Sequence, residues 1–209
     1  MDVEMITVGP VQENCFLVRA DPSATTAVIV DPGEEPERLL EAVAAWGVEL
    51  AAILVTHCHF DHIGAVAPLA KATGAPVYCP QLETRVLADI MSYVPYAGFG
   101  PFTSWEAEHT VAGGERLELA GMTFDVLFTP GHSPGHVTYA VEGHDAVFSG
   151  DVLFESSVGR TDLPGGDHAV LMDSIRMLLE RYPAETVVHP GHMGLTTLGR
   201  EQATNPFLQ

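Results

Sequence analysis

The stretch that decides the fold is Thr56-His57-Cys58-His59-Phe60-Asp61-His62. The apolar residues 51–55 come directly before it and predict a buried strand. Because side chains alternate along an extended chain, His57 and His59 should point to the same side. Asp61 and His62 come next, directly before residues 63–72, which show a helical pattern. Imidazole nitrogens bind zinc, iron, nickel and copper, and a neighbouring carboxylate suits a harder, hydroxide-carrying metal. The stretch therefore predicts a metal site at the end of a strand.

The charge of the chain limits its partners. With 28 acidic and 9 basic residues the net charge is -19, and a field of this sign repels polyanions. We therefore expect no nucleic-acid partner and no binding to membranes, since no apolar run approaches the roughly 18 residues that cross a bilayer. The first residues show no basic segment followed by an apolar one, so we expect no signal peptide and a cytoplasmic protein.

The three cysteines, Cys15, Cys58 and Cys79, are widely spaced and form no C-x-x-C pair. Such a set favours buried thiols in a reducing cytosol over a disulfide framework. Cys58 lies between two candidate ligands, but alternation directs its side chain to the opposite side. We therefore do not expect Cys58 to bind the metal.

Strand and helix patterns alternate along the rest of the chain. Apolar runs predict strands at residues 4–8, 14–19, 27–30, 51–55, 77–79, 115–119, 123–128, 137–141, 146–149 and 186–188. Helices are predicted from Pro36 to just before Gly47, over residues 63–72, and from a cap at Asp167 to just before Pro183.

Four of these strands share one feature, because each ends in a His or Asp flanked by Gly or Pro. The residues concerned are His57 with His59, His132, Asp151 and His192. Strand ends in layered α/β proteins gather along one edge, and sites are built there. We therefore expect these side chains to meet in one cleft.

The set offers too many ligands for one tetrahedral ion but suits two ions that share a bridge. A first group with an open position, the usual form of a catalytic site, is His57, His59 and His132. A second group is Asp61, His62 and His192. Asp151 can bridge the two ions, and a hydroxide between them would be the nucleophile. We assign Asp61 and Asp151 as catalytic residues, and expect two divalent ions, zinc first, with iron or manganese as alternatives.

A family resemblance supports this interpretation. The segments T-H-C-H-F-D-H, P-G-H-S-P-G-H, S-G-D-V-L-F and H-P-G-H, in this order and spacing, resemble the metallo-β-lactamase superfamily across nearly the whole chain. The resemblance implies an α/β fold, the four-layer αββα sandwich, with residues 1–209 as a single hydrolase domain and the same ligand assignments. True β-lactamases usually carry a cysteine where this chain has Asp151, which counts against antibiotic hydrolysis.

Within the superfamily, residues 156–167 and 199–207 look like the short members of the glyoxalase II (hydroxyacylglutathione hydrolase) branch. This likeness implies a small-molecule thioester substrate such as a hydroxyacylglutathione. Only 17 residues follow His192. We therefore expect the C-terminal helical domain of longer glyoxalase II enzymes to be absent and the affinity for the glutathione part of the substrate to be weak.

Three alternatives remain open. A persulfide dioxygenase of the same fold would use one iron on His57, His132 and Asp151, and it shares the G-R-T-D segment at 159–162. A lactone or other ester hydrolase stays within the main interpretation. A non-enzymatic metal-binding or regulatory domain is disfavoured, because structural metal sites are closed. The H-P-G-H segment and the T-N-P-F segment favour the thioester hydrolase, and the oligomeric state is left open.

Some further residues have two possible roles. Arg160 could bind a substrate carboxylate, or it could pair with Asp162 or Asp167. His136 and Asp31 could orient the ligands. The aromatic segment 91–102, which includes Pro95, could wall the pocket or pack on the core. We expect a structural role for His189 and surface positions for His109, His144 and His168.

Overall fold

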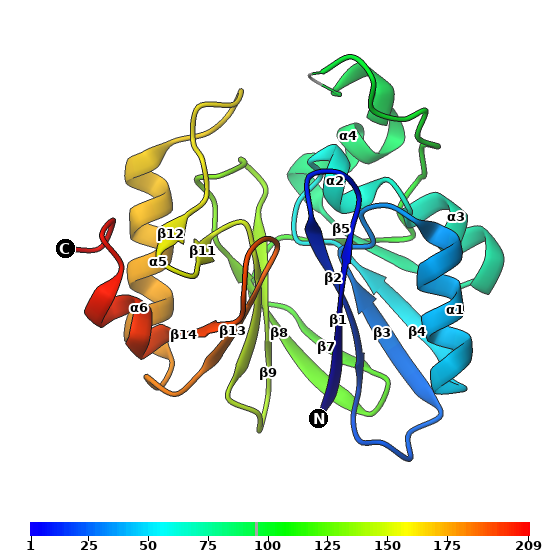
Figure 1. Cartoon of the computed structure of the whole chain (residues 1–209), viewed down its shortest axis with the longest axis horizontal. Coiled ribbons are helices and arrows are strands. Elements are labelled where there is room, and N and C mark those ends of the chain that lie inside the picture. Colours follow the sequence, from blue (N-terminus) through cyan, green and yellow to red (C-terminus); the bar gives the residue numbers. More distant parts are fainter. Residues whose placement is uncertain (95) are drawn as a thin grey trace.

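Apolar strands build two six-stranded sheets in the computed structural model, which describes residues 1–94 and 96–209 (Figure 1). The first sheet follows chain order: β1 (Asp2–Val8), β2 (Glu13–Arg19), β3 (Thr26–Val30), β4 (Glu49–Leu54), β5 (Val77–Pro80) and β6 (His109–Val111). The second sheet has the order β14 (Thr196–Thr197), β13 (Val187–Pro190), β10 (Ala146–Gly150), β9 (Val137–Val141), β8 (Met122–Phe128) and β7 (Arg116–Leu119). A small hairpin of β11 (Leu153–Phe154) and β12 (Ser157–Val158) follows β10.

Helices cover the outer face of each sheet, on the two sides of the molecule in Figure 1. Helices α1 (Pro36–Trp46) and α3 (Val66–Thr73) bury Leu39 and Leu69 against the first sheet. Helices α5 (His168–Arg181) and α6 (Leu198–Thr204) bury Leu171 and Leu198 against the second. Between the sheets a third cluster packs Phe16 against Phe148, with ring centroids 5.4 Å apart. The expected four-layer αββα sandwich is therefore confirmed.

The directions of the strands bring their ends to one edge. Strand β9 runs antiparallel to both β8 and β10, and β10 runs parallel to β13. Strands β8, β10 and β13 therefore all point the same way, and the segments that follow them leave the same edge of the second sheet. Ligands in α/β proteins collect at the carboxyl ends of strands.

Two of the predicted helices have the expected ends. Helix α1 begins at Pro36 and is followed by Gly47, whose N–H bonds the last turn. Helix α5 is capped by the Asp167 carboxylate, which accepts a hydrogen bond from the Val170 N–H.

The prediction of one helix over residues 63–72 is wrong in one respect. The chain forms two helices here, α2 (Phe60–Ile63) and α3, with a break between them. The break falls at Gly64 and Ala65. A β-carbon on Gly64 would lie 2.4 Å from the Gly33 carbonyl oxygen, so the loop after β3 touches the chain here. Tertiary contact, which the local pattern does not reveal, sets the boundary.

Several short elements were not predicted from the sequence. They are the turns η1 (Gln81–Glu83) and η2 (Ile90–Ser92), helices α4 (Thr84–Ala88) and α6, and strands β6, β11, β12 and β14. Each has at most seven residues, too few to show a period. In the part of the chain that the structure describes, no helix has both the length and the apolar character needed to cross a membrane.

Candidate metal centre

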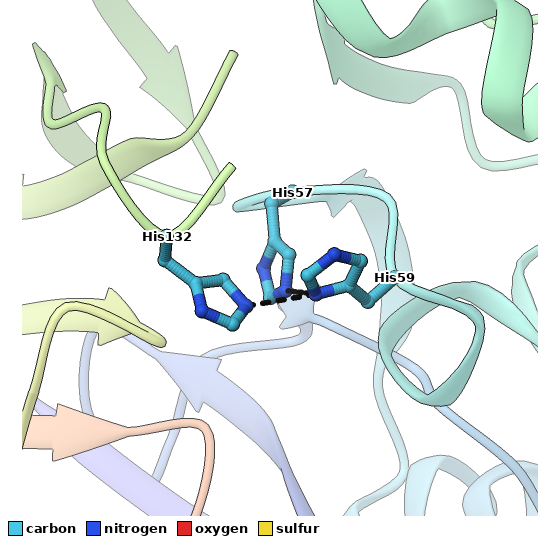
Figure 2. A group of neighbouring side chains, drawn as sticks. All are labelled: His57, His59 and His132. Carbon is cyan, nitrogen blue, oxygen red and sulfur yellow. Dashed lines mark hydrogen bonds between the residues drawn. The ribbon is translucent and has the colours of Figure 1, made fainter. Parts of the chain in front are cut away.

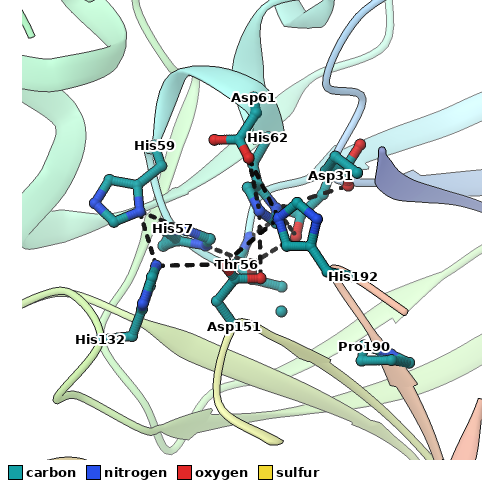
Figure 3. Close-up of polar contacts among 12 residues, drawn as sticks. Asp31, Thr56, His57, His59, Asp61, His62, His132, Asp151, Pro190 and His192 are labelled. Atoms are coloured by element: carbon teal, nitrogen blue, oxygen red, sulfur yellow. Dashed lines mark hydrogen bonds and ion pairs between the residues drawn. The ribbon is translucent and has the colours of Figure 1, made fainter. Parts of the chain in front are cut away.

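The ligand residues expected from the sequence come together at the edge just described (Figure 3). His57 and His59 follow β4, His132 follows β8, and Asp151 follows β10. In the first group, the His59 Nδ1 lies 3.1 Å from the His57 Nε2 and 2.7 Å from the His132 Nε2 (Figure 2). Three ring nitrogens from two distant parts of the chain thus converge on one point.

Hydrogen bonds on the far side of two rings fix which nitrogen carries the proton. The Thr56 hydroxyl donates to the Asp31 Oδ2 at 2.6 Å, so it accepts from the His57 Nδ1, 3.1 Å away. The His132 Nδ1 donates to the Arg160 carbonyl oxygen at 2.8 Å. Both rings therefore turn a lone pair on Nε2 toward His59, whose Nδ1 can donate to only one of them. A cation is the group that this arrangement of lone pairs fits.

The second group is Asp61, His62 and His192, whose ligand atoms lie within 4.8 Å of one another. The His192 Nε2 is 3.3 Å from the Asp61 Oδ2. The His62 Nδ1 donates to the Asp31 Oδ2 at 3.0 Å, which leaves its Nε2 directed into the group. Among the described residues this buried Nε2 has no hydrogen-bond partner. A metal ion would satisfy it.

Asp31 also has an oxygen near His57 and His62, but its two oxygens are already in use. The Oδ1 accepts from the Thr56 N–H at 2.7 Å, and the Oδ2 accepts from the Thr56 hydroxyl and the His62 Nδ1. Asp31 therefore orients these side chains, the role expected from the sequence.

Asp151 faces both groups (Figure 3). Its Oδ1 is 3.4 Å from the His62 Nε2, and its Oδ2 is 3.4 Å from the His132 Nε2 and 3.7 Å from the His192 Nε2. The Oδ1 is buried and has no hydrogen-bond partner among the described residues. One carboxylate is therefore placed to serve two ions.

The backbone of Asp151 is fixed from behind. Its N–H donates to the His136 Nε2 at 3.1 Å, and the other ring nitrogen of His136 lies 3.0 Å from the Thr129 hydroxyl. Residue 150 must be glycine here, because φ is +47° and a β-carbon would lie 2.3 Å from the Thr56 Oγ1. His136 thus orients a candidate ligand, as the sequence suggested.

The electrostatics favour neutral rings at His57 and His59 and ionised carboxylates. At His62, by contrast, burial is outweighed by Asp151 and Asp61, which raise its pKa well above the ordinary value. Burial lowers the pKa of His57 far below its ordinary value, and burial followed by the charge of His132 lowers that of His59 to about 4. Burial alone would raise the pKa of Asp151, but the charges of His62 and His132 lower it well below its ordinary value. Burial also opposes ionisation of Asp61, yet the charge of His62 keeps its pKa low. This donor set fits divalent cations.

A carboxylate that we did not single out from the sequence ties the two loops of the first group together. Glu83, in η1, is buried and accepts hydrogen bonds from the Cys58 N–H at 2.5 Å, the Gly135 N–H at 2.9 Å and the Ser133 hydroxyl. Cys58 neighbours His57 and His59, and Ser133 neighbours His132. The short element that carries Glu83 shows no periodic pattern, so only the structure reveals this role.

Asn14 holds the loop of the second group in a similar way. Its side-chain amide donates to the Pro190 carbonyl at 3.1 Å and to the Met193 carbonyl at 2.8 Å, on either side of the turn to His192. Its backbone N–H donates to the Gly191 carbonyl at 2.7 Å. A polar residue at the start of the apolar run 15–18 was the available signal.

Glu13 was also missed. This side chain is fully buried, its Oε1 lies 3.7 Å from the His62 Nδ1, and neither of its oxygens has a hydrogen-bond partner among the described residues. Burial raises its pKa well above the ordinary value.

Arg160 adopts the pairing that the sequence left open. Its guanidinium makes two hydrogen bonds of 2.7 Å to the Asp162 carboxylate, while Asp167 caps α5 instead. Its carbonyl orients His132, as described above. The structure thus gives Arg160 a positioning role through its backbone, and binding of a substrate by its side chain stays a prediction.

The remaining histidines and Cys58 lie as expected. The His189 ring stacks on Phe148 in the core, with centroids 4.7 Å apart. The Cys58 thiol is buried 3.5 Å from the Cys79 Sγ, away from the centre. Exposed positions are found for His109, His144 and His168.

A cleft of about 1260 Å³ opens over the two groups, with His59, Asp61 and Asp151 among its lining residues. Both roles considered for the 91–102 segment are seen in it. Tyr93 and Val94 line the cleft, whereas Phe102 packs on the core. Pro95 lies outside the described residues.

Comparison with known proteins agrees with this geometry. The model of the metallo-β-lactamase superfamily matches residues 8–192. The probable metallo-hydrolase YqgX of Bacillus subtilis is 40% identical over 206 residues, which cover 96% of this chain and 94% of YqgX. The hydroxyacylglutathione hydrolase GloC of Haemophilus influenzae is 34% identical over 221 residues, which cover 100% of this chain and 98% of GloC.

Solved structures show the same likeness. BLEG-1, described as a B3 metallo-β-lactamase, superposes with a TM-score of 0.93 at 40% identity and covers 100% of both chains. TTHA1623 in a di-iron-bound form has a TM-score of 0.79 at 44% identity, covering 98% of this chain and 100% of its own. ETHE1 from Myxococcus xanthus has a TM-score of 0.79 at 29% identity, and the match covers 99% of this chain and 84% of the ETHE1 chain. Since the family model spans most of the residues and these relatives align over nearly their full length, the chain belongs to the metallo-β-lactamase superfamily.

Proposed function

We propose that the chain is a dinuclear metal-dependent hydrolase that cleaves a thioester such as a hydroxyacylglutathione. The observation that carries the proposal is the position of Asp151, whose two oxygens face a three-histidine group on one side and the group of His62 and His192 on the other. A mononuclear site would leave the His62 Nε2 buried without a partner among the described residues.

The proposed ligands follow from the lone pairs described above. His57, His59 and His132 would hold one ion, Asp61, His62 and His192 the other, and Asp151 both. Divalent ions held there would lower the pKa of water toward neutrality and stabilise the oxyanion that forms on a carbonyl group. The Asp61 carboxylate, 14% exposed at the cleft, would accept a hydrogen bond from the attacking water and orient it. Thr56 and Arg160 keep His57 and His132 in the required tautomers.

The relatives support different parts of this proposal. The names of YqgX and GloC support a metal-dependent hydrolase, and that of GloC supports a glutathione thioester. Zinc is our proposed metal, and the di-iron form of TTHA1623 keeps iron as the alternative. The similarity to BLEG-1 adds β-lactams to the substrates that must be assayed, beside lactones and other esters.

The test is a metal analysis combined with two assays on zinc-loaded and iron-loaded protein. We expect two ions per chain and hydrolysis of S-lactoylglutathione by the zinc form at the same rate with and without air, because thioester hydrolysis takes no electron from the metal. Oxygen uptake with glutathione persulfide by the iron form, without thioester cleavage by either form, would favour the dioxygenase. Faster cleavage of a lactone or β-lactam would replace the thioester, and two bound ions without any activity would favour the non-enzymatic domain.

A further inference from the structure

Large apolar side chains stand exposed at the mouth of the cleft. The exposed fraction is 62% for Leu82, 51% for Tyr93 and 55% for Met193, and all three line the cleft whose floor carries the candidate ligands. Val11, 38% exposed, adds to the same lining. Exposed apolar groups that gather around a concave site are typical of ligand-binding grooves, because a bound apolar group removes them from water.

The size of the cleft points to a substrate larger than its reacting bond requires. Ligand pockets usually enclose roughly 300–1,000 Å³, and this cleft has about 1260 Å³. The lining continues from Asp61 and Asp151 at the floor to the exposed apolar residues at the mouth. A thioester carbonyl at the centre therefore leaves room for one of its two substituents to contact these exposed apolar residues.

Away from the proposed ions, the charges of the cleft disfavour a strongly anionic occupant. Arg85 and Arg160 are the basic residues that line it within the described part of the chain, and the Arg160 guanidinium is already paired with Asp162. The chain as a whole carries a net charge of -19. Away from the proposed ions, a carrier with several phosphates would find few positive partners among the described lining residues, because Arg160 is already paired.

We propose that the cleft selects thioesters whose acyl group is an apolar chain of several carbons, longer than a lactoyl group. The inference rests on the proposed function and names its substrate class. In the reaction, the oxygen of water bonds to the carbonyl carbon, the carbon–sulfur bond breaks with its electron pair on sulfur, and the thiol takes a proton. The products are a fatty acid and a thiol, and no oxidant or reductant is needed.

The experiment compares S-acyl derivatives of one small neutral thiol, N-acetylcysteamine, with acetyl, butyryl, hexanoyl and octanoyl groups. Burying a methylene contributes about 0.8 kcal/mol, a factor of up to about four. Because the residues at the mouth remain partly exposed to water, each methylene should gain less than this limit. We expect kcat/KM to rise at least about twofold per methylene. S-Lactoylglutathione should be a poorer substrate than the octanoyl thioester.

Two variants test whether the exposed residues of the cleft cause the dependence of kcat/KM on chain length. Leu82→Ser and Tyr93→Ser should flatten the dependence of kcat/KM on chain length, and an unchanged metal content would show that the centre itself is intact. Phe207→Ser is the matched control, because Phe207 is 52% exposed but does not line the cleft. It should keep the full dependence.

Binding of a non-hydrolysable octanoyl amide, followed by calorimetry, supplies a second readout that needs no turnover. We expect the wild-type protein to bind the amide with a negative heat-capacity change. In both cleft variants, the affinity should be lower and the heat-capacity change smaller in magnitude. Hydrolysis of the acetyl thioester with no gain from longer chains would overturn the inference and leave the proposed function standing. Loss of hydrolysis for every thioester would overturn the proposed function, and the amide would then still decide whether the cleft binds an apolar chain.

Discussion

At the scale of single residues, the centre depends on hydrogen bonds that act on the far side of each ligand. His57, His62, His132 and His192 each have Nδ1 within reach of an oxygen, at distances between 2.8 and 3.3 Å. Each ring is therefore held with Nε2 toward the centre, whereas His59 turns its Nδ1 inward. Outer contacts of this kind set the tautomer and the direction of a metal-binding histidine.

Asp151→Asn tests the proposed bridge. The amide keeps the shape of the side chain but loses its charge and one of two donor oxygens, so both groups should bind metal more weakly. We expect a metal content below two ions per chain and a rate lower by orders of magnitude, measured by elemental analysis and the thioester assay. Asp61→Asn, the control, should chiefly reduce binding at the second group. Near-normal metal content and rate in Asp151→Asn would contradict the bridge.

His189 gives the protein a dependence on pH that is separate from the centre. Burial lowers its pKa to about 4, against an ordinary value of 6.5, so the folded state prefers the neutral ring. The resulting stability is present above pH 6.5 and is lost as the pH falls toward 4, because the unfolded chain takes up the proton first. We expect the free energy of unfolding of metal-free wild type, minus that of His189→Asn, to fall by up to about 3 kcal/mol over this range. Urea titrations at each pH measure it, and a difference that does not change with pH would refute the burial argument.

At the scale of elements, two anchors hold the loops that carry the ligands. Glu83 joins the loop after β4 to the loop after β8, and Asn14, in β2, holds the turn after β13. Each anchor accepts from or donates to main-chain groups next to a candidate ligand. The ligand loops are therefore positioned independently of any metal.

Glu83→Gln tests the first anchor. The amide must direct its NH2 group at one of three donors, so we expect the loops to shift and the affinity of the first group for metal to fall about 10- to 100-fold. Titration with cobalt(II), followed by its visible absorption, should show a changed spectrum for one of two ions.

Glu201→Gln is the matched control. Glu201 is also buried and also accepts three hydrogen bonds, from the Ser156 N–H, the Thr196 hydroxyl and the Asn205 amide, away from the centre. This variant should lose a similar free energy of unfolding and keep the cobalt affinity and spectrum. Equal effects of the two variants on cobalt would show that Glu83 acts through stability alone.

The strands and the candidate ligands could be predicted from the sequence, whereas these anchors could not. The strands before the ligands were found because they are continuous apolar runs, and the ligands because His and Asp recur at their ends. The seven candidate ligands do come together, although metal binding by each stays a prediction. Glu83 was missed because its partners are two main-chain N–H groups and a hydroxyl, at residues 58, 133 and 135, that no local pattern connects to it. The break between α2 and α3 was missed for the same reason, since contact with the loop after β3 sets it.

At the scale of the whole molecule, the centre joins the two halves of the sandwich. His57, His59, Asp61 and His62 follow β4 of the first sheet, whereas His132, Asp151 and His192 follow strands of the second. Each proposed ion would take ligands from both sides. Metal binding should therefore oppose separation of the sheets and contribute to the free energy of unfolding.

Removal of metal should show this contribution. At a free metal concentration of 100 times Kd, binding adds about 2.7 kcal/mol, which for a chain of this size corresponds to a rise in Tm of at least about 5 °C. We expect EDTA to lower the Tm by this amount and added zinc to restore it, followed by circular dichroism. His192→Ala, which spares the first group, should show an intermediate loss. A Tm that is unaffected by chelation would mean that the ions do not connect the sheets.

The spacing of the ligands along the chain also sets an order of events during synthesis. The three imidazoles of the first group all lie at or before residue 132, whereas His192, the last ligand of the second group, lies 60 positions further on. A nascent polypeptide emerging from the ribosome therefore presents three imidazoles before the second group exists. Asp151 reaches the same region between these two moments. In the proposed dinuclear centre, the three-histidine group would therefore be synthesised first, and an ion held there would add positive charge before the second group is complete.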